Sequence, residues 1–230
     1  QWSPDGKLLA AASRDRADNT VWLWDPATGL ERTRLEGHAS AVAGVCFSSD
    51  GKYLYSAPAL EEQRNPGFAS PMRGEHIRRW DTATGKATEF PLLIGQSVAA
   101  SPRLLAVGSE TIGPRTSVKG GSIVPTELRG TLLTLDGKER TTVLRCGPGV
   151  TFSPDGLYLA VHGVSTGSPP TLAGGVPGEP TRTLAIVDAF DGTEIIAIHG
   201  SHRAVAFTSD GSGIATWAPR GQPIGVMTLK

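Results

Sequence analysis

The side chains that could support catalysis or metal binding in this chain are scattered, not clustered. His199 and His202 are close enough in sequence to share a metal ion, but a zinc site needs two further ligands, and no Cys or His cluster accompanies the pair. The recurrent Asp-Gly pairs lack the dense, alternating carboxylates of a calcium-binding loop. No helix is predicted that could support the strand-to-helix turn of a nucleophilic serine. We therefore expect no catalytic residue, no cofactor and no metal ion.

The cysteines and the charge balance argue against further classes of function. Cys46 and Cys146 lie in different sequence contexts, so we expect two reduced thiols and no disulfide. The 22 basic and 22 acidic residues leave no net field that would attract nucleic acid or an anionic membrane. No apolar window approaches the roughly 18 residues of a membrane-spanning helix. No export signal follows Gln1, which leaves the compartment open, with the cytoplasm as the default.

A repeated turn indicates where the strands that would position any site begin and end. A Ser-Pro-Asp-Gly type of segment follows an apolar stretch and precedes another at residues 3–6, 48–51, 153–156 and 208–211. The interval between the second and third copies is about twice the other intervals. A degenerate copy without Asp-Gly lies inside it at residues 101–103. A repeat of this length is typical of solenoids and propellers.

Each repeat predicts the same order of β-strands. Alternating apolar residues precede the Asp-Gly turn, and a second strand follows it. After a loop comes a third strand that ends in Asp25, Asp81 or Asp188, then a turn containing glycine, then a fourth strand. Four strands joined in this way form an antiparallel meander.

These residues resemble the WD-repeat β-propeller family, in which Gly-His opens a repeat and Trp-Asp closes its third strand. The matches are Gly37-His38 and the pairs that end in Asp25 and Asp81. The resemblance implies an all-β fold, a partial β-propeller of four-stranded antiparallel blades with about five blades or blade pieces. The expected blades are residues 1–37, 38–94, 95–144, 145–200 and 201–230. The first and last look incomplete, so we expect the natural protein to contain more blades.

The resemblance also implies a structural hydrogen-bonded group in each blade. It joins the His of Gly-His, a Ser or Thr on the second strand, an Asp six residues before the Trp, and the Trp indole. The matching residues are Ser13, Asp18 and Trp24 in the first blade and His38, Ser56 and Trp80 in the second. Gly74 takes the place of the second aspartate. We expect a structural role and no catalytic one for these residues.

The connection between the second and third strands is long in three successive blades, at residues 57–76, 108–130 and 163–182. Such insertions emerge on one face of a propeller, where they could form a partner-binding surface or could be tolerated loop length. Possible partner-binding residues in the first of these loops are Arg64, Phe68, Met72 and His76. Alternatively, Phe68 and Met72 pack against their own blade.

The pattern therefore predicts a non-catalytic scaffold whose partner is a protein or peptide, not nucleic acid and not a membrane. An alternative from another class is the regulatory propeller domain of a larger enzyme or signalling protein of kinase or protease type, with catalysis outside this chain. A third is small-ligand binding in the central channel. The sequence specifies neither the partner nor the oligomeric state.

Overall fold

The computed structural model describes eleven stretches of the chain, and within them the structure is all β. Twenty strands and no helix occur in the described part. The described residues are 1–13, 18–59, 76–90, 97–112, 116–118, 121–123, 126–144, 149–164, 182–199, 204–217 and 225–228.

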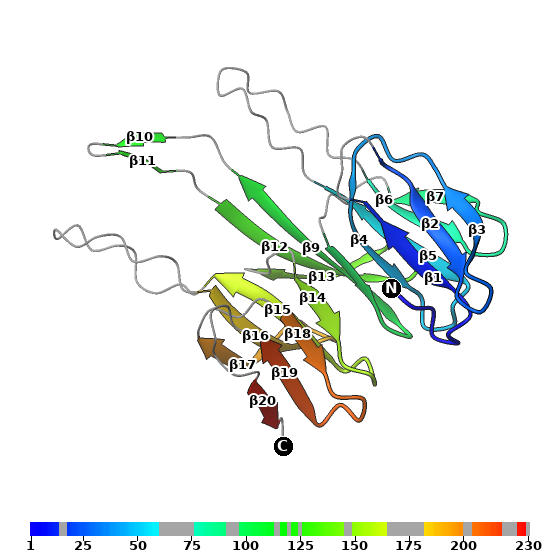
Figure 1. Cartoon of the computed structure of the whole chain (residues 1–230). Coiled ribbons are helices and arrows are strands. Elements are labelled where there is room, and N and C mark those ends of the chain that lie inside the picture. The colour runs from blue at the N-terminus through cyan, green and yellow to red at the C-terminus, as the bar shows by residue number, and fades with distance from the viewer. Residues whose placement is uncertain are drawn as a thin grey trace.

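The strands form five successive antiparallel sheets, each made from one stretch of chain (Figure 1). The first sheet contains β1 (Leu9–Ala12), β2 (Val21–Asp25) and β3 (Leu30–Leu35). The second contains β4 (Val42–Phe47), β5 (Tyr53–Pro58), β6 (Ile77–Asp81) and β7 (Ala87–Phe90). The third contains β8 (Ser97–Ala100), β9 (Leu104–Ile112), β12 (Thr126–Thr134) and β13 (Glu139–Leu144).

The fourth sheet contains β14 (Val150–Phe152), β15 (Tyr158–Val164), β16 (Arg182–Asp188) and β17 (Glu194–His199). The fifth contains β18 (Ala204–Phe207), β19 (Gly213–Trp217) and β20 (Gly225–Thr228). In every sheet, strands that follow one another along the chain pair as neighbours, with β12 following β9 in the third. A small separate ribbon pairs β10 (Thr116–Val118) with β11 (Gly121–Ile123).

The hydrophobic core lies between the sheets, because successive side chains of a strand point to opposite faces. Leu54 of β5 packs toward the first sheet, whereas its neighbour Tyr55 packs toward the third. Leu159 of β15 likewise faces the third sheet, and Ala160 faces the fifth. Four clusters of buried apolar residues thus join the five sheets in sequence order.

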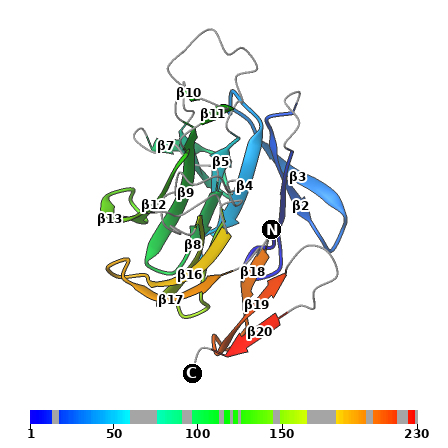
Figure 2. The same cartoon turned by 90° about the vertical axis from the view of Figure 1, so that its left-hand side faces the viewer.

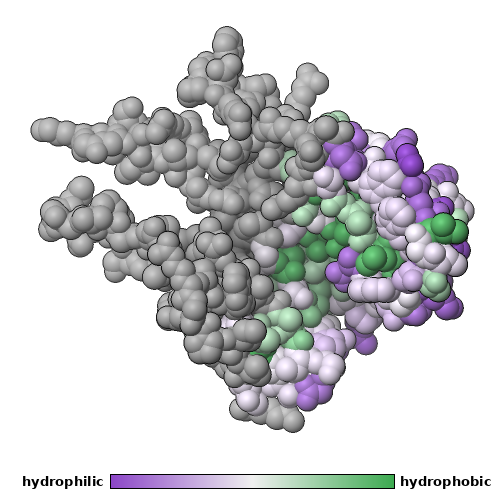
Figure 3. Space-filling view, viewed as in Figure 1, coloured by the Kyte–Doolittle hydropathy of each residue, from purple (hydrophilic) through white to green (hydrophobic). Residues whose placement is uncertain are grey.

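Sheets buried on both faces and stacked in one order are blades. The blades follow one another in an arc (Figure 2). Apolar side chains gather toward the middle of the described surface, and hydrophilic ones lie at the rim of the first two blades (Figure 3). The structure therefore confirms the expected partial β-propeller of four-stranded antiparallel blades.

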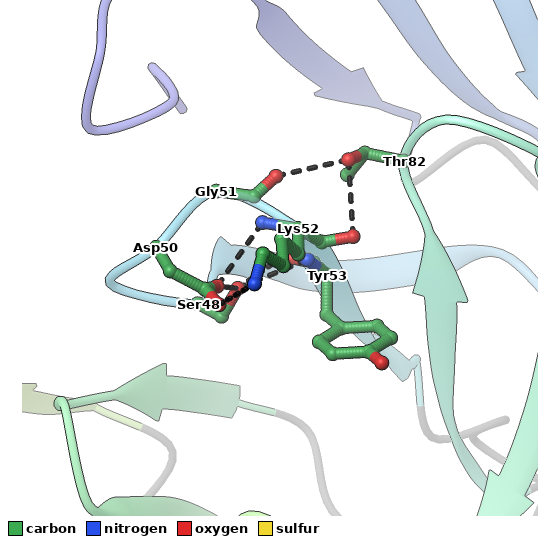
Figure 4. Close-up of polar contacts among 6 residues, drawn as sticks. All are labelled: Ser48, Asp50, Gly51, Lys52, Tyr53 and Thr82. Atoms are coloured by element: carbon green, nitrogen blue, oxygen red, sulfur yellow. Dashed lines mark hydrogen bonds and ion pairs between the residues drawn. The ribbon is translucent and has the colours of Figure 1, made fainter.

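The Asp-Gly turns are held by one repeated set of hydrogen bonds (Figure 4). In the second blade the Ser48 hydroxyl donates to Asp50 Oδ1 at 2.7 Å, and Ser48 Oγ accepts the Tyr53 N–H at 2.9 Å. The Lys52 N–H donates to the same Asp50 oxygen at 3.1 Å. The turns of the fourth and fifth blades repeat this pattern at Ser153 and Thr208. A Ser or Thr at the first turn position and an Asp two residues later therefore fix the hairpin.

Consecutive Asp-Gly turns touch one another across the blade boundaries. A Cβ placed on Gly51 would lie 3.8 Å from Cδ of Pro4 in the preceding blade. The corresponding distance is 3.7 Å between Gly211 and Pro154. The proline of one turn thus rests on the glycine of the next.

The two ends of the propeller differ. The turn end carries the Asp-Gly turns, such as residues 48–52, and the turns between third and fourth strands, such as residues 82–85. The loop end carries the connections between second and third strands. Part of the third of these connections, which we expected to be a loop over residues 108–130, is sheet: β9 continues to Ile112, β12 starts at Thr126, and β10 and β11 pair beyond them. Its Thr, Ile and Val residues favour extended structure, which explains the difference.

Candidate functional site

A group of three hydrogen-bonded polar side chains lies buried between the first and second blades. His38 Nε2 and Ser56 Oγ are 2.6 Å apart, and the Trp80 indole N–H donates to the same Ser56 oxygen at 2.8 Å. His38, Ser56 and Trp80 are 2%, 0% and 1% exposed. The Ser56 hydroxyl donates to His38 when the ring carries its proton on Nδ1. A serine that is closed off from solvent and engaged by both neighbours has no access to a substrate.

Second-blade and first-blade groups surround this buried trio. The Asn19 side-chain amide donates to the His38 carbonyl. The Arg78 guanidinium lies 5.9 Å from the centre of the Trp80 ring and pairs with Glu89 at 2.7 Å. The Asn19 contact ties the loop that carries His38 to the first blade, and the Arg78 guanidinium lies against Gly37 of the same loop. The arrangement favours a structural role.

The structure does not bring the corresponding first-blade residues together in the same way. Asp18 Oδ1 accepts the Thr20 N–H at 3.1 Å, and the Ser13 carbonyl accepts the Val42 N–H of the second blade. Trp24 is half-buried and stacks on Trp22, with 6.3 Å between ring centres. The Trp24 indole makes no hydrogen bond to any residue that the structure describes. The structural role of these three residues stays a prediction.

Of the possible partner-binding residues at the loop end, only His76 is described. It precedes β6, is half-buried, and its Nδ1 atom is buried without a hydrogen-bond partner among the described residues. Arg64, Phe68 and Met72 lie outside the described residues. Their role in partner binding stays a prediction.

Sequence reasoning overlooked two residues at the turn end. Leu157 and Phe190, both in the fourth blade, are among the most exposed large apolar side chains that the structure describes. The signal was present in the sequence, since the residue after Asp-Gly is Lys7, Lys52, Leu157 and Ser212 in successive complete copies. Only one copy carries an apolar residue at this position.

The described residues contain no group of three or more potential metal ligands. Cys46 is buried and reduced, and burial raises the pKa of its thiol far above the ordinary range, so it is no nucleophile. Cys146 lies outside the described residues. A Gly-x-Ser-x-Gly sequence occurs at residues 163–167, but it begins in β15 and no helix occurs in the part of the chain that the structure covers. Nor does that part contain a helix that could span a membrane.

Two comparisons place this chain among proteins of known sequence. The family model described as "WD domain, G-beta repeat" matches residues 1–25 and 29–59. The nuclear distribution protein PAC1 of Coccidioides posadasii is 30% identical over 161 residues, which covers 67% of this chain and 32% of that protein. The U5 small nuclear ribonucleoprotein 40 kDa protein of Mus musculus is 39% identical over 56 residues, 24% of this chain and 15% of that protein.

Two further similarities extend the picture. The chromatin assembly factor 1 subunit FAS2 homolog of Oryza sativa subsp. japonica is 41% identical over 56 residues, which covers 24% of this chain and 10% of that protein. The chain spans a third or less of these curated relatives. Among solved structures, hydrazine synthase of Kuenenia stuttgartiensis superposes with a TM-score of 0.67 at 17% identity, over 94% of this chain and 59% of that one. At this identity the likeness concerns the fold alone.

Proposed function

Because this chain belongs to the WD-repeat family, we propose that it is a non-catalytic scaffold that binds a protein or peptide partner at the loop end of its propeller. The blades supply a rigid support, since the second, third and fourth are buried on both faces against their neighbours. The neutral charge balance favours a protein partner over nucleic acid.

The observation that carries the proposal is the one-sided growth of the blades. β9 and β12 are nine residues long, and β15 and β16 are seven, whereas β5 and β6 have six and five. The additional pairs all lie at the loop end, and β10 and β11 project further in the same direction (Figure 1). Surfaces that are built out from a rigid scaffold commonly serve in recognition.

The relatives support the same class of function. By their names, two of them are components of assemblies, a small nuclear ribonucleoprotein and a chromatin assembly factor. A propeller that joins other proteins together fits such a role, and no described residue of this chain suggests a reaction.

The register of the long hairpins allows a clean test. Ile112 pairs with Thr126 and Val164 pairs with Arg182, so a two-residue Asn-Gly turn can close each hairpin directly after these pairs. One variant replaces residues 113–125 in this way, and a second replaces residues 165–181. The control variant carries one exposed change at the other end, Lys52→Ser.

Each protein is expressed in the native host and its partners are recovered by affinity purification with quantitative mass spectrometry. We expect at least one partner to fall several-fold with the shortened hairpins and to stay constant with the control. Circular dichroism checks that the strand content is retained. Equal recovery from all folded variants would contradict the proposal.

A further inference from the structure

At the turn end, each regular blade presents two outward residues side by side on a fixed support. In the second blade these are Lys52 and Ala83. The Lys52 and Ala83 N–H groups donate to Asp50 and Asp81, both at 3.1 Å. The Thr82 N–H donates to the Lys52 carbonyl at 2.9 Å, which joins the two turns. The first blade has Lys7 in the position of Lys52.

The fourth blade uses the same support for two large apolar residues. The Leu157 N–H donates to Asp155 Oδ1 at 3.0 Å, and the Phe190 N–H donates to Asp188 Oδ1 at 2.6 Å. The Ala189 N–H donates to the Leu157 carbonyl at 2.9 Å, as Thr82 does in the second blade. Leu157 is 58% exposed and Phe190 is 69% exposed. We name this pair the Leu157–Phe190 doublet.

Single exposed apolar residues are common on protein surfaces and need no explanation. The doublet differs because its two residues lie on turns whose backbones are joined by a hydrogen bond, in positions that hold lysine and alanine in the second blade. An aromatic residue on a rigid support loses little conformational entropy on binding, so it is well suited to anchor a partner.

The charges around the doublet indicate the chemistry of that partner. In other blades a lysine pairs with the turn aspartate; these pairs are Lys7 with Asp5, Lys52 with Asp50, and Lys138 with Asp136. Leu157 cannot pair with Asp155. The third-blade turn that faces Gly156 contributes one exposed cation, Arg103. The described parts of the fourth and fifth blades contain five acidic residues, Asp155, Asp188, Asp191, Glu194 and Asp210, and one basic residue. That residue, Arg182, begins β16 at the loop end.

Two of these carboxylates, Asp155 and Asp191, are held in the ionised form by hydrogen bonds. Hydrogen bonds from the Ser153 hydroxyl and the Leu157 N–H lower the pKa of Asp155, and bonds from Thr193 lower the pKa of Asp191. The doublet is therefore an apolar patch beside fixed negative charge.

We propose that the Leu157–Phe190 doublet docks a basic segment of a partner protein, one in which an aromatic or aliphatic side chain is flanked by lysine or arginine. The apolar side chain contacts Leu157 and Phe190, and the cations contact the aspartates. This site lies at the turn end and is independent of the loop-end surface proposed above. It gives the scaffold a second binding surface.

Other occupants fit the charges less well. Two copies of this chain that met through their doublets would bring two acidic rims together, and like charges at an interface oppose association. An anionic membrane would be repelled for the same reason. A basic protein segment satisfies both the apolar and the charged parts of the surface.

The test selects peptides from a displayed library of random sequences of about twelve residues against the full chain. We expect enriched peptides to combine an apolar residue with at least two neighbouring basic residues, and to bind more weakly as the salt concentration rises. Enrichment of acidic or uncharged peptides, or of none, would overturn the proposal.

Two double variants locate the site. Leu157→Lys with Phe190→Ala copies the second blade and should weaken binding roughly tenfold or more. Lys52→Leu with Ala83→Phe places a doublet on the second blade and should add a second binding event in titration calorimetry. Thermal unfolding checks that both variants fold.

If the enriched peptides bind the first double variant as tightly as the unchanged protein, the doublet is not their site and the proposal is wrong. Sedimentation of the free protein tests the competing occupant. Self-association that the first double variant abolishes would assign the doublet to a second copy of this chain and would also overturn the proposal.

Discussion

Removal of the Ser56 hydroxyl should destabilise the protein more than any other serine-to-alanine change in the second blade. The Ser56 oxygen is fully buried and serves two partners at once, the Trp80 indole N–H and His38 Nε2. Alanine at this position removes the hydrogen-bond partner of the Trp80 indole N–H and of the His38 Nε2 atom, and both side chains are buried away from water.

The size of this destabilisation follows from the buried polar groups that lose Ser56 as a partner. A buried donor that loses its only partner costs about 1 to 3 kcal/mol, and an ordinary hydrogen bond contributes about 1 kcal/mol net. The two lost bonds of Ser56→Ala should therefore reduce the free energy of unfolding by about 2 to 4 kcal/mol. That is a large share of the 5 to 15 kcal/mol that is typical of folded domains.

Equilibrium unfolding in urea, followed by far-UV circular dichroism, measures this loss. The matched control is Ser49→Ala, an exposed serine of the same blade, which should change the free energy of unfolding by less than about 0.5 kcal/mol. In a Trp80→Phe background, Ser56→Ala should cost about 1 kcal/mol less than in the unchanged protein. If Ser56→Ala destabilises the protein no more than Ser49→Ala, the buried trio does not hold the two blades together.

Three further outcomes are expected. Gly156→Ala should lower the free energy of unfolding in urea by about 2 kcal/mol or more, and Gly6→Ala by only about 1 kcal/mol. Both glycines have φ near +70°, but a Cβ at Gly156 would also lie 3.1 Å from the serine of the preceding turn. Hydrogen bonds from Ser48 and the Lys52 backbone lower the pKa of Asp50. The contribution of these bonds to the stability of the protein is therefore present above the ordinary carboxyl pKa and is lost as the pH falls. Asp50→Asn should flatten the decline of thermal stability below about pH 4. Cys46 should react with a thiol reagent only at the rate of unfolding, and Cys46→Ala should lack this slow phase; fast reaction in the native state would refute its burial.

Much of the fold was predictable because the repeat carries information at several levels. The Asp-Gly turns mark the hairpins, and the apolar strands around them, such as β5, need burial on both faces. The spacing of His38, Ser56 and Trp80 also led to residues that do meet in the structure. Sequence spacing succeeded there because the three residues belong to regular strands and a short loop.

Other features of the structure could not be predicted from the pattern of this one sequence. The contacts of Arg78 with Glu89 and Trp80 depend on the register between β6 and β7 within the second blade, which the spacing of the turns does not encode. The strands within residues 108–130 were missed because their Gly and Pro residues suggested a loop. Leu157 was passed over because its exposure depends on the turn geometry, which places it outward and away from the core.

The contacts between consecutive turns also limit how such a molecule can change over evolutionary time. Proline on one turn meets glycine on the next at three boundaries, but the second blade has Ser49 where that proline would be, and the third blade lacks the facing glycine. Both partners of that contact are absent together. A blade that is duplicated or exchanged by recombination would therefore carry a turn proline or glycine that fits its former neighbour. It would pack in its new place only where the adjoining turn has the matching glycine or proline.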